Sequence, residues 1–153
     1  MLIAIAAIGF ASCSTEESST DAVEAEQPRQ PTPTPVITQT EGVTQVVIHL
    51  SPTEGQGQLG TATFVSGGQN TSVEISVEPS TSEAQPIHIH SGVCTDVGAV
   101  IHALQNVVKG HSLTVIDLPI EQVFSGNVLV NVHESYANAS NYTACGQLPE
   151  ELP

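Results

Sequence analysis

Three histidines stand at spacings that could bind a metal ion. His88 and His90 are two residues apart in Ile87-His88-Ile89-His90. On a β-strand both imidazoles project from one face and the isoleucines from the other, because side chains alternate along a strand. His133 ends the apolar run 128–133, and the same alternation places it opposite the three valines of that run. Neutral imidazole is the commonest metal ligand, so the pattern predicts a metal site on the outer face of two strands.

The alternative is that these are ordinary surface residues. A single outward histidine on a strand usually has no ligand role, because histidine occurs on surfaces for many reasons. A His-x-His pair together with a third outward histidine on another strand favours a ligand set over that alternative.

The elements that must position these histidines are short strands. Apolar and polar residues alternate with period two from about residue 43, and turn-forming residues separate the runs. The turn segments are Gly55-Gln56-Gly57 and Gly67-Gly68-Gln69-Asn70. Strands are predicted near 46–50, 59–65, 73–77, 86–90, 112–118 and 127–133, with one short helix at 119–124. The pattern predicts an all-β domain over residues 43–149, an antiparallel β-sandwich or Greek-key barrel.

The N-terminal segment predicts export. Residues 2–12 carry no charge, are too short to span a bilayer, and lead into Cys13. The segment Phe10-Ala11-Ser12-Cys13 resembles a bacterial lipobox, in which a cysteine becomes lipidated. We therefore expect residues 1–12 to be a signal peptide and lipidated Cys13 to anchor the mature protein to the bacterial cell envelope. The alternative is a plain secretory signal, which would release the protein.

Residues 13–42 are expected to form a solvated tether. They are rich in Ser, Thr, Glu and Gln and contain the Pro-Thr-Pro-Thr-Pro run at 31–35. With almost no apolar side chains to bury, such a segment does not pack into a core.

The two remaining cysteines, Cys94 and Cys145, form an even pair in a domain expected to be exported. An oxidising compartment favours a disulfide between them. Metal ligation by their thiolates is the weaker alternative, because neither has a Cys-x-x-Cys partner.

Charge excludes two classes of partner. The chain has 16 acidic and 2 basic residues, a net charge of −14. Nucleic acids and anionic membrane surfaces attract clustered Lys and Arg, whereas Arg29 and Lys109 stand far apart. We therefore expect neither as a direct partner.

Taken in order, several of these motifs resemble the copper/zinc superoxide dismutase family, in its short secreted bacterial branch. The resemblance covers about residues 44–148. It consists of the Gly-Gln-Gly turn, His88-Ile89-His90, Cys94-Thr95 followed by Gly98, Val132-His133-Glu134, and Ala144-Cys145-Gly146. The chordin-like domain, another short β fold with a His-x-His strand, is a second and weaker resemblance.

The family resemblance implies a Greek-key β-barrel with shortened loops. It also implies copper ligation by His88, His90 and His133, and a disulfide between Cys94 and Cys145.

The sequence departs from the family pattern at three places. Val100 stands where the family has the histidine that bridges copper and zinc, and His102 could substitute only if the loop shifts. Most zinc ligands are missing, with His111 and Asp117 as stray candidates. Tyr142 stands where the family has the arginine that guides superoxide. The resemblance therefore implies copper, does not extend to a complete zinc site, and leaves dismutase activity open.

Two functions remain open from the sequence. The first is an exported copper-binding lipoprotein, with His102 or water as a fourth ligand, that either dismutes superoxide slowly or buffers copper in the envelope. The second is a metal-free β-sandwich module for adhesion or partner binding. From residue 41 onward the sequence contains eleven acidic residues and one basic residue, Lys109, which gives this part a net charge of −10. This charge disfavours attraction of the superoxide anion.

Overall fold

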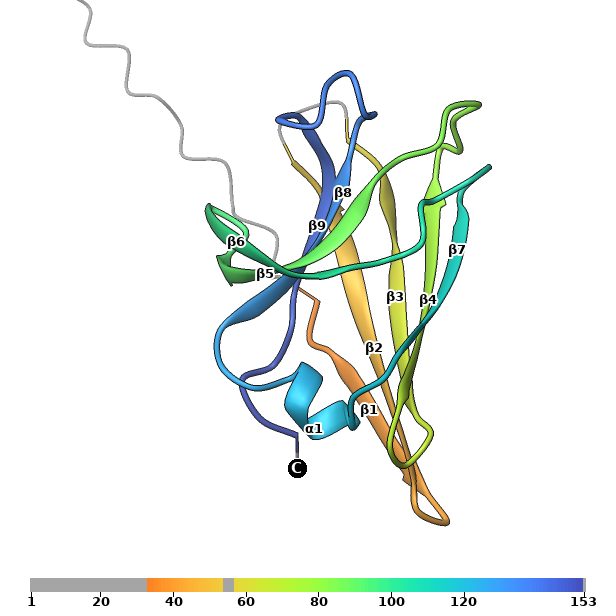
Figure 1. Cartoon of the computed structure of the whole chain (residues 1–153), viewed down its shortest axis with the longest axis vertical. Coiled ribbons are helices and arrows are strands. Elements are labelled where there is room, and N and C mark those ends of the chain that lie inside the picture. Colours follow the sequence, from red (N-terminus) through yellow and green to blue (C-terminus); the bar gives the residue numbers. More distant parts are fainter. Residues whose placement is uncertain (1–32, 54–56, 153) are drawn as a thin grey trace, which may run out of the picture. The chain divides into compact units, whose positions relative to one another are not determined.

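The computed structural model describes residues 33–53 and 57–152, and these residues form an antiparallel β domain (Figure 1). The predicted signal peptide and Cys13 lie outside the described residues. The elements are β1 Val36–Thr40, β2 Val43–Pro52, β3 Leu59–Ser66, β4 Thr71–Glu78, β5 Ile87–Val93, β6 Asp96–Ala103, β7 His111–Ile116, α1 Ile120–Val123, β8 Val128–His133 and β9 Tyr142–Gln147.

The strands form one curled sheet with the order β6-β5-β8-β9-β2-β3-β4-β7, and β1 pairs with β2 outside this path. One half contains β2, β3, β4 and β7, and the other contains β6, β5, β8 and β9; Ser51 and Pro52 of β2 pair with β9 and join them. The chain crosses between the halves after β4, β6 and β7. The predicted all-β antiparallel class is confirmed.

The core lies between the two halves, on the concave side of the sheet. Each central strand contributes alternate residues to it, as its period-two sequence predicts. Phe64 of β3 meets Phe124, which follows α1, edge to face at 4.9 Å, so that α1 covers one end of the core. The fully buried apolar residues that the strands contribute to this core are Val46, Ile48, Leu50, Ala62, Phe64, Val73, Ile75, Val77, Ile87, Ile89, Val130, Val132 and Ala144.

The folded domain is longer at both ends than the predicted 43–149. β1 lies inside the predicted tether and pairs with β2, with Val36 opposite Val47. Only Ile37 of β1 packs against the core, so the strand lacks the alternation that marked the others. At the other end, Leu152 also packs against the core. The prediction of a tether reaching residue 42 is therefore wrong for 36–40.

The register between β5 and β8 sorts their side chains between two faces. Ile87 lies opposite Val132 and Ile89 opposite Val130, and these four side chains fill the core. His88 lies opposite Asn131 and His90 opposite Leu129, so these side chains lie on the other face.

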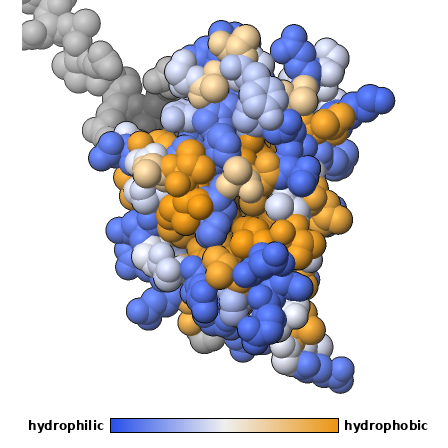
Figure 2. Space-filling view, in the orientation of Figure 1, coloured by the Kyte–Doolittle hydropathy of each residue, from blue (hydrophilic) through white to orange (hydrophobic). Residues whose placement is uncertain are grey.

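Apolar side chains are also exposed on the two edge strands: Val100 and Ile101 on β6, and Leu113 and Val115 on β7. Figure 2 shows apolar residues gathered across the middle of one face. No helix among the described residues is long and apolar enough to cross a membrane.

The predicted disulfide is present. Cys94, in the turn between β5 and β6, is bonded to Cys145 of β9, with 5.9 Å between their Cα atoms. The bond closes a loop of 51 residues and ties the β5–β6 turn to β9 across the intervening β8. A disulfide of this kind is typical of an oxidising, extracytoplasmic compartment.

We expect removal of this bond to destabilise the domain. Closing a loop of this length is worth about 4 kcal/mol in the chain-entropy treatment, and losses on removal of native disulfides are about 2–5 kcal/mol. The double variant Cys94→Ser/Cys145→Ser should therefore show a lower denaturant midpoint. Its m-value should be slightly larger, because the unfolded chain is no longer cross-linked and exposes more surface. A loss below about 1 kcal/mol would contradict the structural role of the bond.

Candidate metal centre

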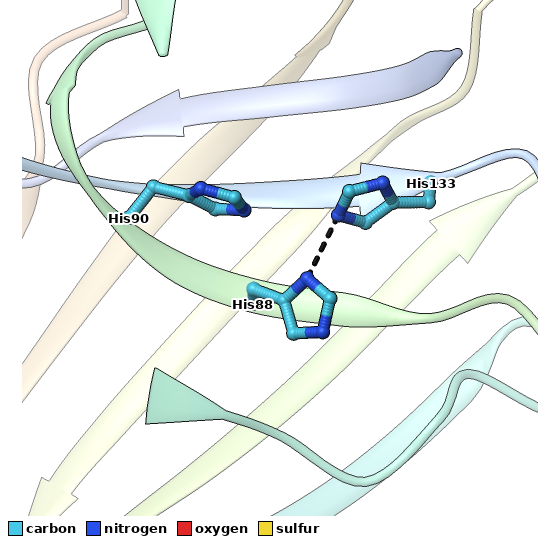
Figure 3. Close-up of side chains that lie close together, drawn as sticks. All are labelled: His88, His90 and His133. Carbon is cyan, nitrogen blue, oxygen red and sulfur yellow. Dashed lines mark hydrogen bonds between the residues drawn. The ribbon is translucent and has the colours of Figure 1, made fainter. Parts of the chain in front are cut away.

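Three imidazoles converge on the outer face of β5 and β8 (Figure 3). One ring nitrogen from each of His88, His90 and His133 lies within 4.8 Å of the other two. We call these three residues the histidine cluster. Imidazole nitrogens bound to one metal ion at about 2.0–2.1 Å lie about 3.3–3.6 Å apart. A metal ion therefore needs only small side-chain movements to contact all three rings.

The cluster is more buried than its position on the outer face suggests. His90 and His133 are 4% and 5% exposed, and His88 is half-buried. The prediction that they lie on the face away from the core is confirmed. Cover from other segments, including the loop 134–141 and β6, was not visible in the sequence pattern.

Backbone carbonyls fix the protonation of two rings. His133 Nδ1 donates to the carbonyl oxygen of Ala139, and His90 Nδ1 donates to that of Gly98 at 3.0 Å. A carbonyl only accepts, so in each neutral ring the proton is on Nδ1 and the lone pair is on Nε2. Both Nε2 atoms are thus available as metal ligands, and His90 Nε2 is buried without a hydrogen-bond partner.

The third ring makes the contact that a metal ion would replace. His88 Nδ1 lies 2.9 Å from His133 Nε2 and donates to it, since that atom carries the lone pair (Figure 3). If the proton of His88 moves to its Nε2, its Nδ1 becomes a ligand as well. The neutral cluster can therefore offer three lone pairs through a change of tautomer at one ring, without net loss of a proton.

The loop 134–141 holds Ala139 in place. Glu134 begins it, and its amide donates to the carbonyl of Asn141 at 2.8 Å. The Glu134 carboxylate accepts from Asn141 Nδ2 at 2.9 Å. Glu134 is exposed and bound to the loop, so it orders the segment that orients His133.

A glycine allows the contact to His90. A Cβ at Gly98 of β6 would lie 2.5 Å from the hydroxyl oxygen of Ser91 and 2.9 Å from its carbonyl oxygen. Any side chain here would push β6 away from β5 and move the carbonyl that orients His90.

A buried glutamine pair, absent from our sequence-based predictions, supports the backbone of His133. Gln85 Nε2 donates to Gln58 Oε1 at 2.8 Å and to the carbonyl of His133 at 3.1 Å. Gln58 Nε2 returns a hydrogen bond to Gln85 Oε1 at 3.1 Å. Both side chains are buried, but their sequence neighbours are mostly polar or turn-forming, so no local pattern marked them.

Tyr142 of β9 lies beside the cluster. Its ring packs edge-on against His133, with centroids 5.0 Å apart, and lies 6.4 Å from His90. The side chain at this position is uncharged, so it supplies no positive field to attract an anion.

His102 lies outside the cluster. It is opposite Ile89 in the β5–β6 register, so its side chain lies on the face opposite His88 and His90. The structure therefore does not bring His102 together with the three ligand candidates. The β6 residue opposite His90 is Val100, which cannot bind metal. His111 and Asp117 also lie outside the cluster.

Burial and mutual repulsion favour the neutral forms of His88 and His133. Burial lowers the pKa of His88 below 6.5, and repulsion from protonated His133 and His90 lowers it further. Burial also lowers the pKa of His133; the hydrogen bond to Ala139 opposes this shift and repulsion from His90 adds to it. Protons therefore compete less well with a metal ion for these rings than for ordinary histidines.

Comparison with known proteins identifies no relative. No protein-family model, curated protein or solved structure matches the chain.

We expect the metal-free protein to lose stability as the pH falls. The pKa values of His88 and His133 are lower in the folded state, so the unfolded chain binds protons first. Their contribution is fully present above about pH 6.5 and is lost as the pH falls through the folded-state pKa values. Denaturant midpoints measured from pH 7.5 to 5 should fall.

The variant His88→Gln should flatten this pH dependence, whereas His111→Gln, at an exposed position on β7, should leave it unchanged. Two results would contradict the lowered pKa values of His88 and His133. The first is a denaturant midpoint that rises as the pH falls from 6.5 to 5, and the second is a pH dependence of the midpoint that His88→Gln does not change.

Proposed function

We propose that this chain is an extracytoplasmic copper-binding protein of the copper/zinc superoxide dismutase type, in which His88, His90 and His133 hold the metal. The observation that carries the proposal is the convergence of three imidazole nitrogens within 4.8 Å, with two Nδ1 atoms tied to backbone carbonyls. Such second contacts orient metal-binding histidines and fix their tautomers. The order of the motifs and the crossings between the two sheet halves favour a Greek-key barrel of that family.

Copper suits this donor set better than other metals. Imidazole ligands suit copper, zinc, iron and nickel, and copper heads the affinity order of the divalent first-row metals. Zinc is less favoured as a resident second metal, since Val100 replaces a bridging ligand and His102 lies on the other face of the sheet. When bound to three imidazoles, copper can alternate between Cu(I) and Cu(II).

Storage or transport of copper is favoured over rapid dismutation. Fast reaction with superoxide requires positive potential at the metal. The chain from residue 41 onward has a net charge of −10, and Tyr142 beside the cluster carries no positive charge. Lys109 is exposed in the connection between β6 and β7. Superoxide is therefore at most a slow substrate.

Attachment to the envelope through Cys13 belongs to the same proposal. The disulfide supports an oxidising compartment. The mass of the mature protein tests the anchor, because a lipidated Cys13 adds acyl chains that a plain secretory protein lacks.

Copper binding is tested by equilibrium dialysis of the full chain with Cu(II), followed by metal analysis. The wild type should retain about one equivalent of copper. Bound copper should also raise the free energy of unfolding by about 2.7 kcal/mol when the free copper concentration is one hundred times the Kd. The variants His88→Gln and His133→Gln should each lose most of this uptake. The matched control His102→Gln should retain it.

Uptake below half an equivalent, or uptake unchanged by His88→Gln, would reject the copper site and favour a metal-free binding module. A dismutation rate no greater than that of free copper would remove enzymatic activity from the proposal and leave copper storage.

A further inference from the structure

Asn131 lies in the middle of the surface from which the histidines project. On β8 it is directly opposite His88 of β5 and opposite Cys145 of β9. His133 follows it two residues later, on the same face of the strand. The neighbours of Asn131 on this face therefore include two members of the histidine cluster and one half of the disulfide.

The carboxamide of Asn131 is buried without a partner. The residue is 0% exposed, and neither Oδ1 nor Nδ2 makes a hydrogen bond. Native proteins leave few buried polar atoms unpaired, because each lost interaction with water then goes uncompensated. An apolar residue at this position would avoid that penalty.

The unpaired atoms are concentrated at one site. Among the described residues, the buried side-chain atoms without a hydrogen bond are Oδ1 and Nδ2 of Asn131 and Nε2 of His90. His90 is diagonal to Asn131, since it lies opposite Leu129, two residues before Asn131 on β8. Asn131 Oδ1 and His90 Nε2 both carry lone pairs, so one metal ion would satisfy these two atoms together, whereas Nδ2 only donates.

We propose that Asn131 is the fourth ligand of the metal site and binds through its carboxamide oxygen. The inference rests on the proposed function. Three imidazoles leave one position open, and His102 cannot fill it from the opposite face of the sheet. An amide oxygen is a known weak ligand of copper beside histidines. Rotation of the carboxamide about its terminal bond can turn Oδ1 toward the cluster.

This role predicts effects of opposite sign on stability and on binding. The variant Asn131→Val removes two unsatisfied polar atoms, so it should raise the denaturant midpoint of the metal-free protein. The same change removes a ligand, so it should weaken Cu(II) binding at least tenfold and alter the EPR spectrum of the Cu(II) complex. A merely structural asparagine would instead lose stability on substitution and leave the spectrum unchanged.

The control is Leu129→Val, on the same face of β8 and equally buried. It should lower stability through lost packing and leave copper affinity and the EPR spectrum unchanged. If Asn131→Val fails to fold, the EPR spectrum of Cu(II)-loaded Asn131→Asp tests the ligand role of residue 131 instead. A carboxylate ligand in place of the amide must shift the Cu(II) g and hyperfine values.

A wild-type affinity and spectrum in Asn131→Val, or an unchanged spectrum in Asn131→Asp, would overturn the assignment of Asn131 and leave the three-histidine site standing. Failure of the wild-type chain to bind Cu(II) would instead reject the proposed function, and this inference with it.

Discussion

The register between β5 and β8 is the constraint on which both the core and the histidine cluster depend. With Ile87 opposite Val132, the isoleucines of β5 enter the core and the histidines lie together on the other face. A slip of one residue would bury the histidines in the core and expose the isoleucines, because side chains alternate with period two. The apolar side chains that stabilise the sheet therefore also fix the geometry of the cluster.

Hydrogen bonds from the histidines to backbone carbonyls determine which ring nitrogens carry lone pairs. The carbonyls of Gly98 and Ala139 hold the protons of His90 and His133 on Nδ1. Each carbonyl belongs to a segment held by other interactions: β6 beyond the disulfide-bonded turn, and the loop ordered by Glu134. Burial favours the neutral forms of His88 and His133, so protons compete less well with a metal ion for these two rings.

Sequence patterns predicted the strands that are buried on one face, and with them the positions of the histidines. The His-x-His pair, the third histidine and the cysteine pair could be placed because alternation fixes which face a side chain occupies. The strands β1, β6 and β9 could not be predicted in this way: β1 buries little, β6 is exposed, and β9 contains an irregularity near Thr143. Because β6 has no such pattern, the sequence did not indicate which face of the sheet carries His102. The role of Asn131 depends on which atoms remain unpaired after folding, which no local pattern contains.

The central claim is that one copper ion is bound by the three members of the histidine cluster. Anomalous diffraction at the copper edge from crystals of the Cu-loaded chain tests it most directly. We predict a single strong peak about 2 Å from Nδ1 of His88 and from Nε2 of His90 and His133, a distance normal for imidazole ligation. A peak at His49, His102 or His111 with none at the cluster would contradict the claim.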